Sequence, residues 1–142
     1  MPHGAARALA TYQEVTVTSR SPLELVVMLY DGLLASLRHA HEAMGRQDLF
    51  GKRDGLHKAL QLVEHLQGTL DMDGGGEAAA HLDEFYRQVT GLVLGANLDG
   101  DRQHLAEAIR LVASVREAWE QLATVAAVAP PLASARIAAE AR

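Results

Sequence analysis

The sequence predicts an all-α protein folded as an antiparallel four-helix bundle. Proline occurs only at positions 2, 22, 130 and 131, so residues 23–129 contain no proline to break a helix. The same stretch shows no strand-like alternation and is dominated by helix-forming residues. Its apolar residues recur in four stripes at alternating spacings of three and four. Four such stripes, on helices of roughly 20–25 residues joined by short links, are typical of an antiparallel bundle.

Length and pattern divide the chain into three parts. A chain of 142 residues that is 49% apolar and 22% charged has the composition of one globular domain with its own core. We expect residues 1–20 to form an N-terminal arm and residues 21–125 to form the bundle. Residues 126–142, which are rich in Ala and Pro, are expected to form a mobile C-terminal tail.

Charge, cysteine content and hydropathy exclude several classes of protein. The net charge is −5 and no basic run is present, so we do not expect a nucleic-acid-binding protein. Without cysteine the chain has no disulfide, no thiolate metal site and no cysteine nucleophile. The apolar run at residues 25–30 is far shorter than the ~20 residues that span a membrane, and no secretory signal is visible. We therefore predict a cytoplasmic location without membrane insertion.

The first helix is predicted to begin at a capping box. Ser21 is the N-cap, Pro22 occupies the first helical position, and Glu24 reaches back to a free backbone N–H. Gly45 ends this helix. Its apolar stripe consists of Val26, Tyr30, Leu33, Leu37, Ala40 and Met44.

The other three helices repeat the same rhythm. The second is expected to start near Asp48, and Asp101 is the expected N-cap of the fourth, after the break "ANLDGD". The second stripe consists of Leu56, Ala59, Val63, Leu66 and Leu70. The third consists of Ala78, Leu82, Phe85, Val89, Leu92 and Ala96. The fourth consists of Leu105, Ala108, Val112, Val115, Trp119 and Leu122.

The glycine-rich stretch "LDMDGGGE" between the second and third stripes is interpreted as a turn. A calcium loop starting at Asp71 would need an oxygen ligand at Gly75 and a glutamate at Leu82. A phosphate-binding loop would need Lys-Ser or Lys-Thr where Glu77 and Ala78 follow the glycines. Both ligand readings fail, whereas glycines that end one helix and a glutamate in the first turn of the next fit a simple link.

The seven histidines give little support for a metal centre. A di-iron bundle needs Glu-x-x-His on two helices, and the nearest matches are Asp54-x-x-His57 and Asp101-x-x-His104. Neither pair lies on an apolar stripe, and no catalytic triad or nucleotide fingerprint is visible. We expect neither an enzyme nor a cofactor, and keep a carboxylate–histidine metal-binding bundle as an alternative.

The bundle carries more apolar residues than the four stripes need. Leu25, Met28 and Leu29 adjoin the first stripe, Leu60 and Leu62 the second, and Tyr86 and Val93 the third. They form either a wide core face or a groove for an amphipathic partner helix. Self-assembly through this surface, as a structural helical protein, is a further alternative.

The segment "TYQEVTVTSRSP" before the capping box is too β-branched and polar to continue a helix. Its apolar residues Tyr12, Val15 and Val17 could lie across the bundle as a detachable cover. The alternative is an ordinary N-terminal arm held by one aromatic side chain.

The order of these motifs resembles the FliS family, the flagellar secretion chaperones for flagellin. The resemblance runs from about residue 12 to about residue 122. It is carried by "YQEVTVTSRSP" followed by "LELVVMLYDGLL", then "LDMDGGGEAAAHLDEFY", "ANLDGD" and "VREAWEQL".

The resemblance implies a helical bundle, monomeric or weakly dimeric, that binds the disordered C-terminal segment of flagellin. Binding would prevent premature polymerisation and deliver flagellin to the type III export gate, where FlhA is the implied partner. By the same resemblance, Tyr12 and Val17 belong to an N-terminal cover that flagellin displaces. The residues implied to line the partner-binding groove are Leu25, Met28, Leu29, Tyr30, Leu82, Phe85 and Tyr86.

Overall fold

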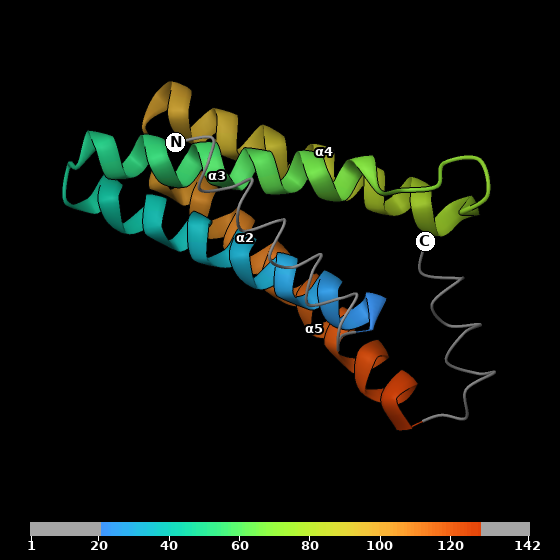
Figure 1. The fold of residues 1–142 in the computed structure, drawn as a ribbon. Helices are drawn as coiled ribbons and strands as arrows, with labels where there is room; N and C mark the ends of the chain where they lie inside the picture. The colour runs from blue at the N-terminus through green and yellow to red at the C-terminus, as the bar shows by residue number, and fades with distance from the viewer. Residues whose placement is uncertain (1–20, 129–142) are drawn as a thin grey trace.

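The computed structural model describes residues 21–128, and there it confirms an all-α bundle of four helices (Figure 1). The helices are α2 (Pro22–Gly45), α3 (Leu49–Gly68), α4 (Gly76–Asp99) and α5 (Arg102–Val128). The last of them extends past residue 125, where we expected the bundle to end. The predicted cover residues Tyr12, Val15 and Val17, and the tail from residue 129 onward, lie outside the described residues.

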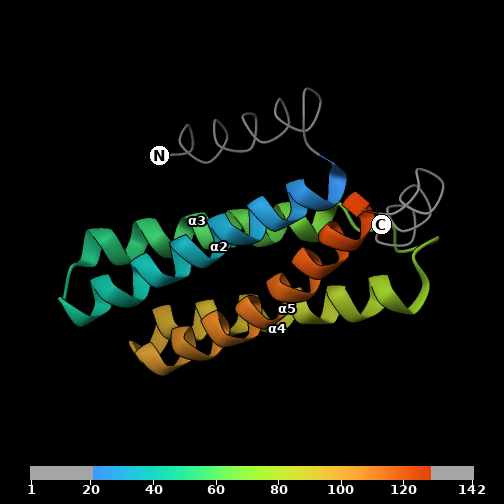
Figure 2. The same ribbon diagram turned by 90° about the horizontal axis from the view of Figure 1, so that it is seen from below.

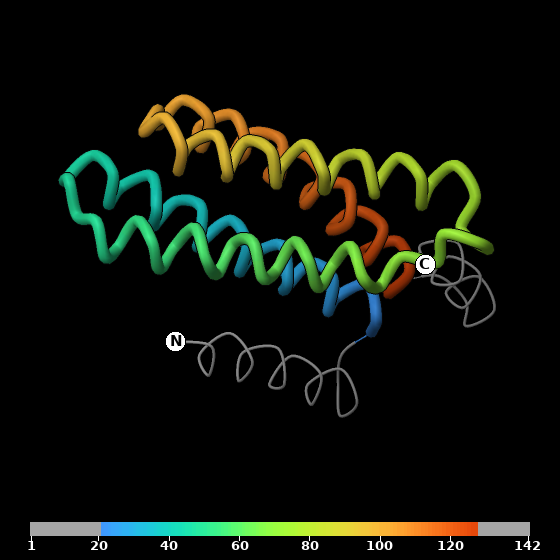
Figure 3. Tube along the Cα trace, turned by 90° about the horizontal axis from the view of Figure 1, so that it is seen from above, coloured from blue at the N-terminus to red at the C-terminus, as the bar shows by residue number. Residues whose placement is uncertain are grey.

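The helices form a closed ring in the order α2, α3, α4, α5, and α5 packs back against α2. Helix α2 packs against α3 and α5, and α4 packs against the same two helices, so α2 and α4 are diagonal partners. Figures 2 and 3 show α2 with α3 on one side of the bundle and α4 with α5 on the other. The α2–α3 and α4–α5 turns meet at one end, and the α3–α4 turn lies at the other (Figure 1). Within residues 21–128 no helix is long and apolar enough to cross a membrane.

The predicted helix starts are confirmed by their caps. The Glu24 N–H donates to Ser21 Oγ at 3.1 Å, with Pro22 in the first turn of α2. The Gly51 N–H donates to Asp48 Oδ1 at 2.9 Å at the start of α3. At α5 the Gln103 N–H donates to Asp101 Oδ1 at 2.9 Å. Each side chain satisfies a backbone donor that has no partner inside its helix.

The glycine-rich stretch is a turn, as the sequence indicated. Asp71 Oδ1 accepts a hydrogen bond from the Gly74 N–H at 2.9 Å, which closes the link after α3. Gly76 then opens α4 with a φ of 60°, a left-handed conformation that glycine adopts without a steric penalty. In the described part of the chain, no three His, Asp or Glu side chains gather into a possible metal site.

The first, second and fourth predicted stripes face the core over most of their lengths. The buried members of these stripes are Tyr30, Leu33, Leu37, Ala40, Leu56, Ala59, Val63, Leu66, Leu105, Ala108, Val112 and Trp119. Those that are only half-buried are Val26, Met44, Leu70 and Val115. Leu122 is exposed, and beyond Trp119 the half-buried Ala123 and Ala126 continue the packing of α5 against the core.

The predicted third stripe is wrong by part of a turn. The buried residues of α4 are Ala79, Tyr86, Val89, Val93 and Ala96. Of the predicted stripe, Ala78 is exposed and Leu82, Phe85 and Leu92 are only half-buried. Both sets have helical spacing, and the bulky Tyr86 and Val93 decide which side turns inward. The wide-core interpretation therefore holds for Tyr86 and Val93, and likewise for the buried Leu29 and Leu62.

Helices α2 and α3 come so close at one point that only glycine fits. A Cβ atom on Gly55 would lie 2.8 Å from both the Ala40 nitrogen and the Ser36 carbonyl oxygen. Both are backbone atoms of α2, which cannot move aside as a flexible side chain can. A glycine in a helix interior usually lowers stability, so its presence here reflects this contact.

We predict that Gly55→Ala destabilises the bundle by about 1–3 kcal/mol, because the added methyl group pushes α2 away from α3. Gly91→Ala is the matched control, since a Cβ atom there would meet no atom within 4 Å. The control should gain about 0.5–1 kcal/mol from helix propensity alone. Urea unfolding measures both values, and stabilisation by Gly55→Ala would contradict the close contact.

Candidate functional site

The seven residues implied to line the groove occupy two kinds of position. Leu29, Tyr30 and Tyr86 are buried in the core. The structure leaves Leu25, Met28, Leu82 and Phe85 half-buried. The residues come from α2 and α4, which lie diagonally across the bundle, so the structure does not bring all seven into one groove.

The two buried tyrosines join these diagonal helices. The hydroxyl oxygens of Tyr30 and Tyr86 are 2.8 Å apart and share a hydrogen bond. The Tyr30 ring also lies beside Trp119 of α5, with ring centroids 6.4 Å apart. Burial raises the pKa of both tyrosine hydroxyls, so both stay protonated and one can donate to the other. This contact sets the rotation of α2 and α4 and hence which of their side chains face outward.

Met28 lies in a groove between the start of α2 and the end of α5. The groove has a volume of about 390 Å³. Its apolar lining comes from Val27 and Met28 on α2 and from Ala123 and Ala127 on α5. The small alanines keep α5 from filling the space beside Met28. The groove can therefore take the apolar face of a helix.

The walls of this α2–α5 groove are acidic. Glu24, Asp31 and Glu120 contribute three carboxylates to its lining. Arg116 pairs with Asp31 at 2.7 Å and with Glu120, and so ties α2 to α5. The ion pair with Asp31 raises the pKa of the Arg116 guanidinium. Because Asp31 and Glu120 share the single cation of Arg116, this part of the wall keeps a net negative charge and favours a segment that carries basic side chains beside its apolar face.

The family resemblance implied that Met28 lines a partner-binding groove, and the structure places Met28 in the lining of the α2–α5 groove, whose α5 wall was not predicted. Ala123 and Ala127 follow Trp119 at successive steps of four, which places them on the same side of the helix. That signal was present in the sequence. Ala127 was overlooked because the tail was predicted to begin at residue 126, and Ala123, inside the predicted bundle, was not assigned to any groove.

Comparison with known proteins identifies the family. The profile described as "Flagellar protein FliS" matches residues 5–126. The chain belongs to the FliS family. The match spans all four helices almost to the end of α5, as well as most of the segment before α2.

Individual FliS relatives agree with the family profile. The flagellar secretion chaperone FliS of Salmonella typhimurium is 36% identical over 110 residues, which cover 77% of this chain and 82% of the relative. FliS of Bacillus subtilis is 33% identical over 110 residues, covering 78% and 81%. FliS of Vibrio cholerae is 31% identical over 119 residues, covering 81% and 88%. The names of these relatives describe chaperones rather than enzymes.

The tyrosine pair gives a test of how α2 and α4 are joined. We predict that Tyr30→Phe and Tyr86→Phe each cost about 1–3 kcal/mol of stability, because each leaves a buried hydroxyl without its partner. The double variant should cost less than the sum of the two single changes, since no hydroxyl is then stranded. Chemical unfolding of the four proteins measures this coupling. Strictly additive losses would show that the two hydroxyls do not depend on each other.

Proposed function

We propose that this chain is a cytosolic export chaperone that binds the disordered C-terminal segment of flagellin. Binding prevents premature polymerisation, and the complex delivers flagellin to the flagellar type III export gate, where FlhA is the docking partner. The observation that carries this proposal is the FliS match over residues 5–126, together with relatives named flagellar secretion chaperones. The α2–α5 groove supplies a surface suited to a helical segment of such a client.

Flagellin would bind as an amphipathic helix with its apolar face in the α2–α5 groove. Met28 and Val27 would contact that face, and the carboxylates of the walls would attract basic side chains on its flanks. The half-buried Leu25, Leu82 and Phe85 offer further apolar area as the segment continues around the bundle. The buried core residues Leu29, Tyr30 and Tyr86 would not contact the client. Their role would be to position the half-buried residues of α2 and α4 that do contact it.

The N-terminal segment is proposed to cover this surface when no client is bound. It joins α2 at Ser21, one helical turn before Glu24 in the groove wall. Tyr12, Val15 and Val17 would shield the apolar lining, which would otherwise favour aggregation. A short cover held at a few points loses little when it is displaced, so a longer client helix can replace it.

The groove is tested by comparing two methionine variants. Met28→Gln keeps the length and charge of the side chain but puts a polar amide against the client's apolar face. We expect binding of a flagellin C-terminal peptide to weaken at least about tenfold, or ~1.4 kcal/mol. Met72→Gln is the matched control, because Met72 is exposed in the turn between α3 and α4, outside the groove.

Isothermal titration calorimetry on the full-length protein measures these affinities. Equal affinities for Met28→Gln and the unaltered chain would remove the α2–α5 groove from the binding site. Failure of the unaltered chain to bind the peptide would contradict the proposed function itself.

Removal of residues 1–18 tests the cover. The truncated chain should keep its four helices, because the cap at Ser21 is intact, and it should aggregate more readily without a client. It should bind the flagellin peptide as tightly as the full chain or more tightly. In the full chain the cover would occupy the groove in a fraction of the molecules, and this competition would be absent after truncation. Circular dichroism checks the fold and calorimetry measures the affinity. Complete loss of binding by an intact bundle would make Tyr12 a direct client contact instead of a lid.

A further inference from the structure

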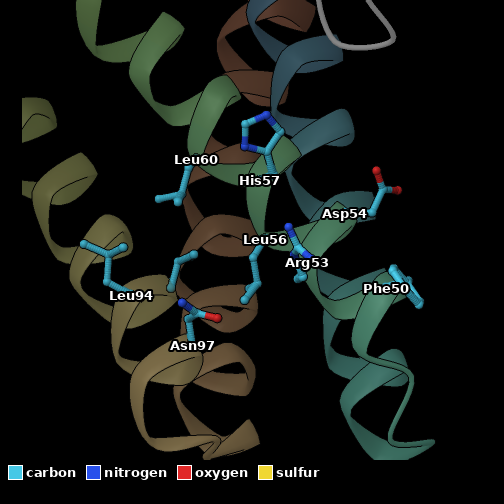
Figure 4. Close-up of a pocket in the computed structure, with 9 residues that line it drawn as sticks. Phe50, Arg53, Asp54, Leu56, His57, Leu60, Leu94 and Asn97 are labelled. Carbon is cyan, nitrogen blue, oxygen red and sulfur yellow. The ribbon is translucent and has the colours of Figure 1, made fainter. Parts of the chain in front are cut away.

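A second groove lies between α3 and α4, in the half of the bundle that contains the α2–α3 and α4–α5 turns. Its volume is about 690 Å³. Leu56 and Val93 form its buried floor, and the half-buried Leu60 extends it along α3. Figure 4 shows Leu56 and Leu60 on the α3 side, with Leu94 opposite them on α4. None of these residues belongs to the α2–α5 groove described above.

The rim of this α3–α4 groove exposes large apolar side chains. Phe50 is 82% exposed on α3 and Leu94 is 51% exposed on α4. Leu98, one helical turn after Leu94, is 89% exposed. In a four-helix bundle the natural place for such residues is the core. Two exposed large apolar side chains on the rim of one groove, with a third one turn beyond it, are typical of a surface that a partner covers.

The α3 lining of the groove holds one cation, Arg53, and one carboxylate, Asp54. The segment "KRDGLHK" at residues 52–58 contains three cations and one carboxylate. That carboxylate, on Asp54, pairs with Lys58 at 3.3 Å. Among residues 21–128 no carboxylate lies within ion-pair distance of Lys52 or Arg53, and Arg53 lines the groove.

The α4 side of the groove contributes no charge. Residues 88–98 of α4, "QVTGLVLGANL", include neither an acidic nor a basic side chain. On its α3 flank, a helix bound in the groove would therefore meet Arg53 and the carboxylate of Asp54, which Lys58 neutralises. On its α4 flank it would meet no charge. Acidic side chains beside an apolar stripe complement this arrangement.

We propose that the α3–α4 groove docks an amphipathic helix of a second partner protein, whose apolar face fills the groove and whose acidic flank meets Arg53. From Phe50 to Leu60 the α3 wall spans ten residues, or about 15 Å, so roughly three turns of helix suffice. The partner is distinct from the segment bound by α2 and α5, because that groove is acidic and repels an acidic helix. The two grooves lie in opposite halves of the bundle, so both can be occupied together (Figure 1).

The proposal is tested with two synthetic helical peptides that share one leucine stripe. One peptide carries Glu on both flanks and the other carries Lys. Fluorescence anisotropy with the full-length chain should detect the acidic peptide despite the protein's negative net charge. Arg53→Glu and Leu94→Glu should each weaken its binding at least about tenfold, or ~1.4 kcal/mol. Arg110→Glu makes the same charge change at an exposed position on α5 and should leave the affinity unchanged.

Several outcomes would overturn the proposal. One is no binding of the acidic peptide, and another is an equal loss in Arg110→Glu and Arg53→Glu. Displacement of the acidic peptide by a flagellin C-terminal peptide would assign the groove to the client. A dimer in sedimentation analysis that Leu94→Glu converts to a monomer would make it a contact between copies of this chain. Circular dichroism confirms the fold of each variant, and Arg53→Glu, at an exposed site, keeps the test decisive if Leu94→Glu unfolds.

Discussion

The hydrogen bond between the hydroxyls of Tyr30 and Tyr86 is the constraint on which the rest of the structure depends. In the described bundle every other buried side chain apart from Trp119 is apolar, and apolar packing alone allows a helix to rotate with little penalty. Two buried hydroxyls can be satisfied only when α2 and α4 present them to each other. Once the tyrosines face inward, the nearby Met28 and Phe85 lie nearer the surface, where both are half-buried.

The helices and their limits could be predicted because their signals are local. Ser21, Asp48 and Asp101 each bond to a backbone donor within three residues, so no information from another helix is needed. The inward face of α4 could not be predicted in this way. Two sets of its residues share the helical period, and the choice between them depends on Tyr30, which is 56 residues from Tyr86 in the sequence.

The same physical limit applies to the exposure of the residues at the candidate site. Met28 and Leu29 are neighbours with similar hydropathy, yet one lines a groove and the other is buried. Which of the two turns outward depends on how α5 packs against α2, including the ion pairs of Arg116. The motifs identified the family directly, because family membership depends on the order of residues along the chain rather than on their exposure.

The two grooves differ in charge because each uses a different part of a chain whose charges are unevenly distributed. Acidic residues of α2 and α5 line the groove beside Met28, whereas Arg53 lines the groove of α3 and α4. Both grooves have apolar linings, so the hydrophobic effect alone would let either accept the same helix. The opposite charges remove that ambiguity, since the wrong helix would place like charges together at a cost in binding free energy. If both proposed sites are occupied as argued, a small bundle with almost no polar core would present two surfaces with different selectivity.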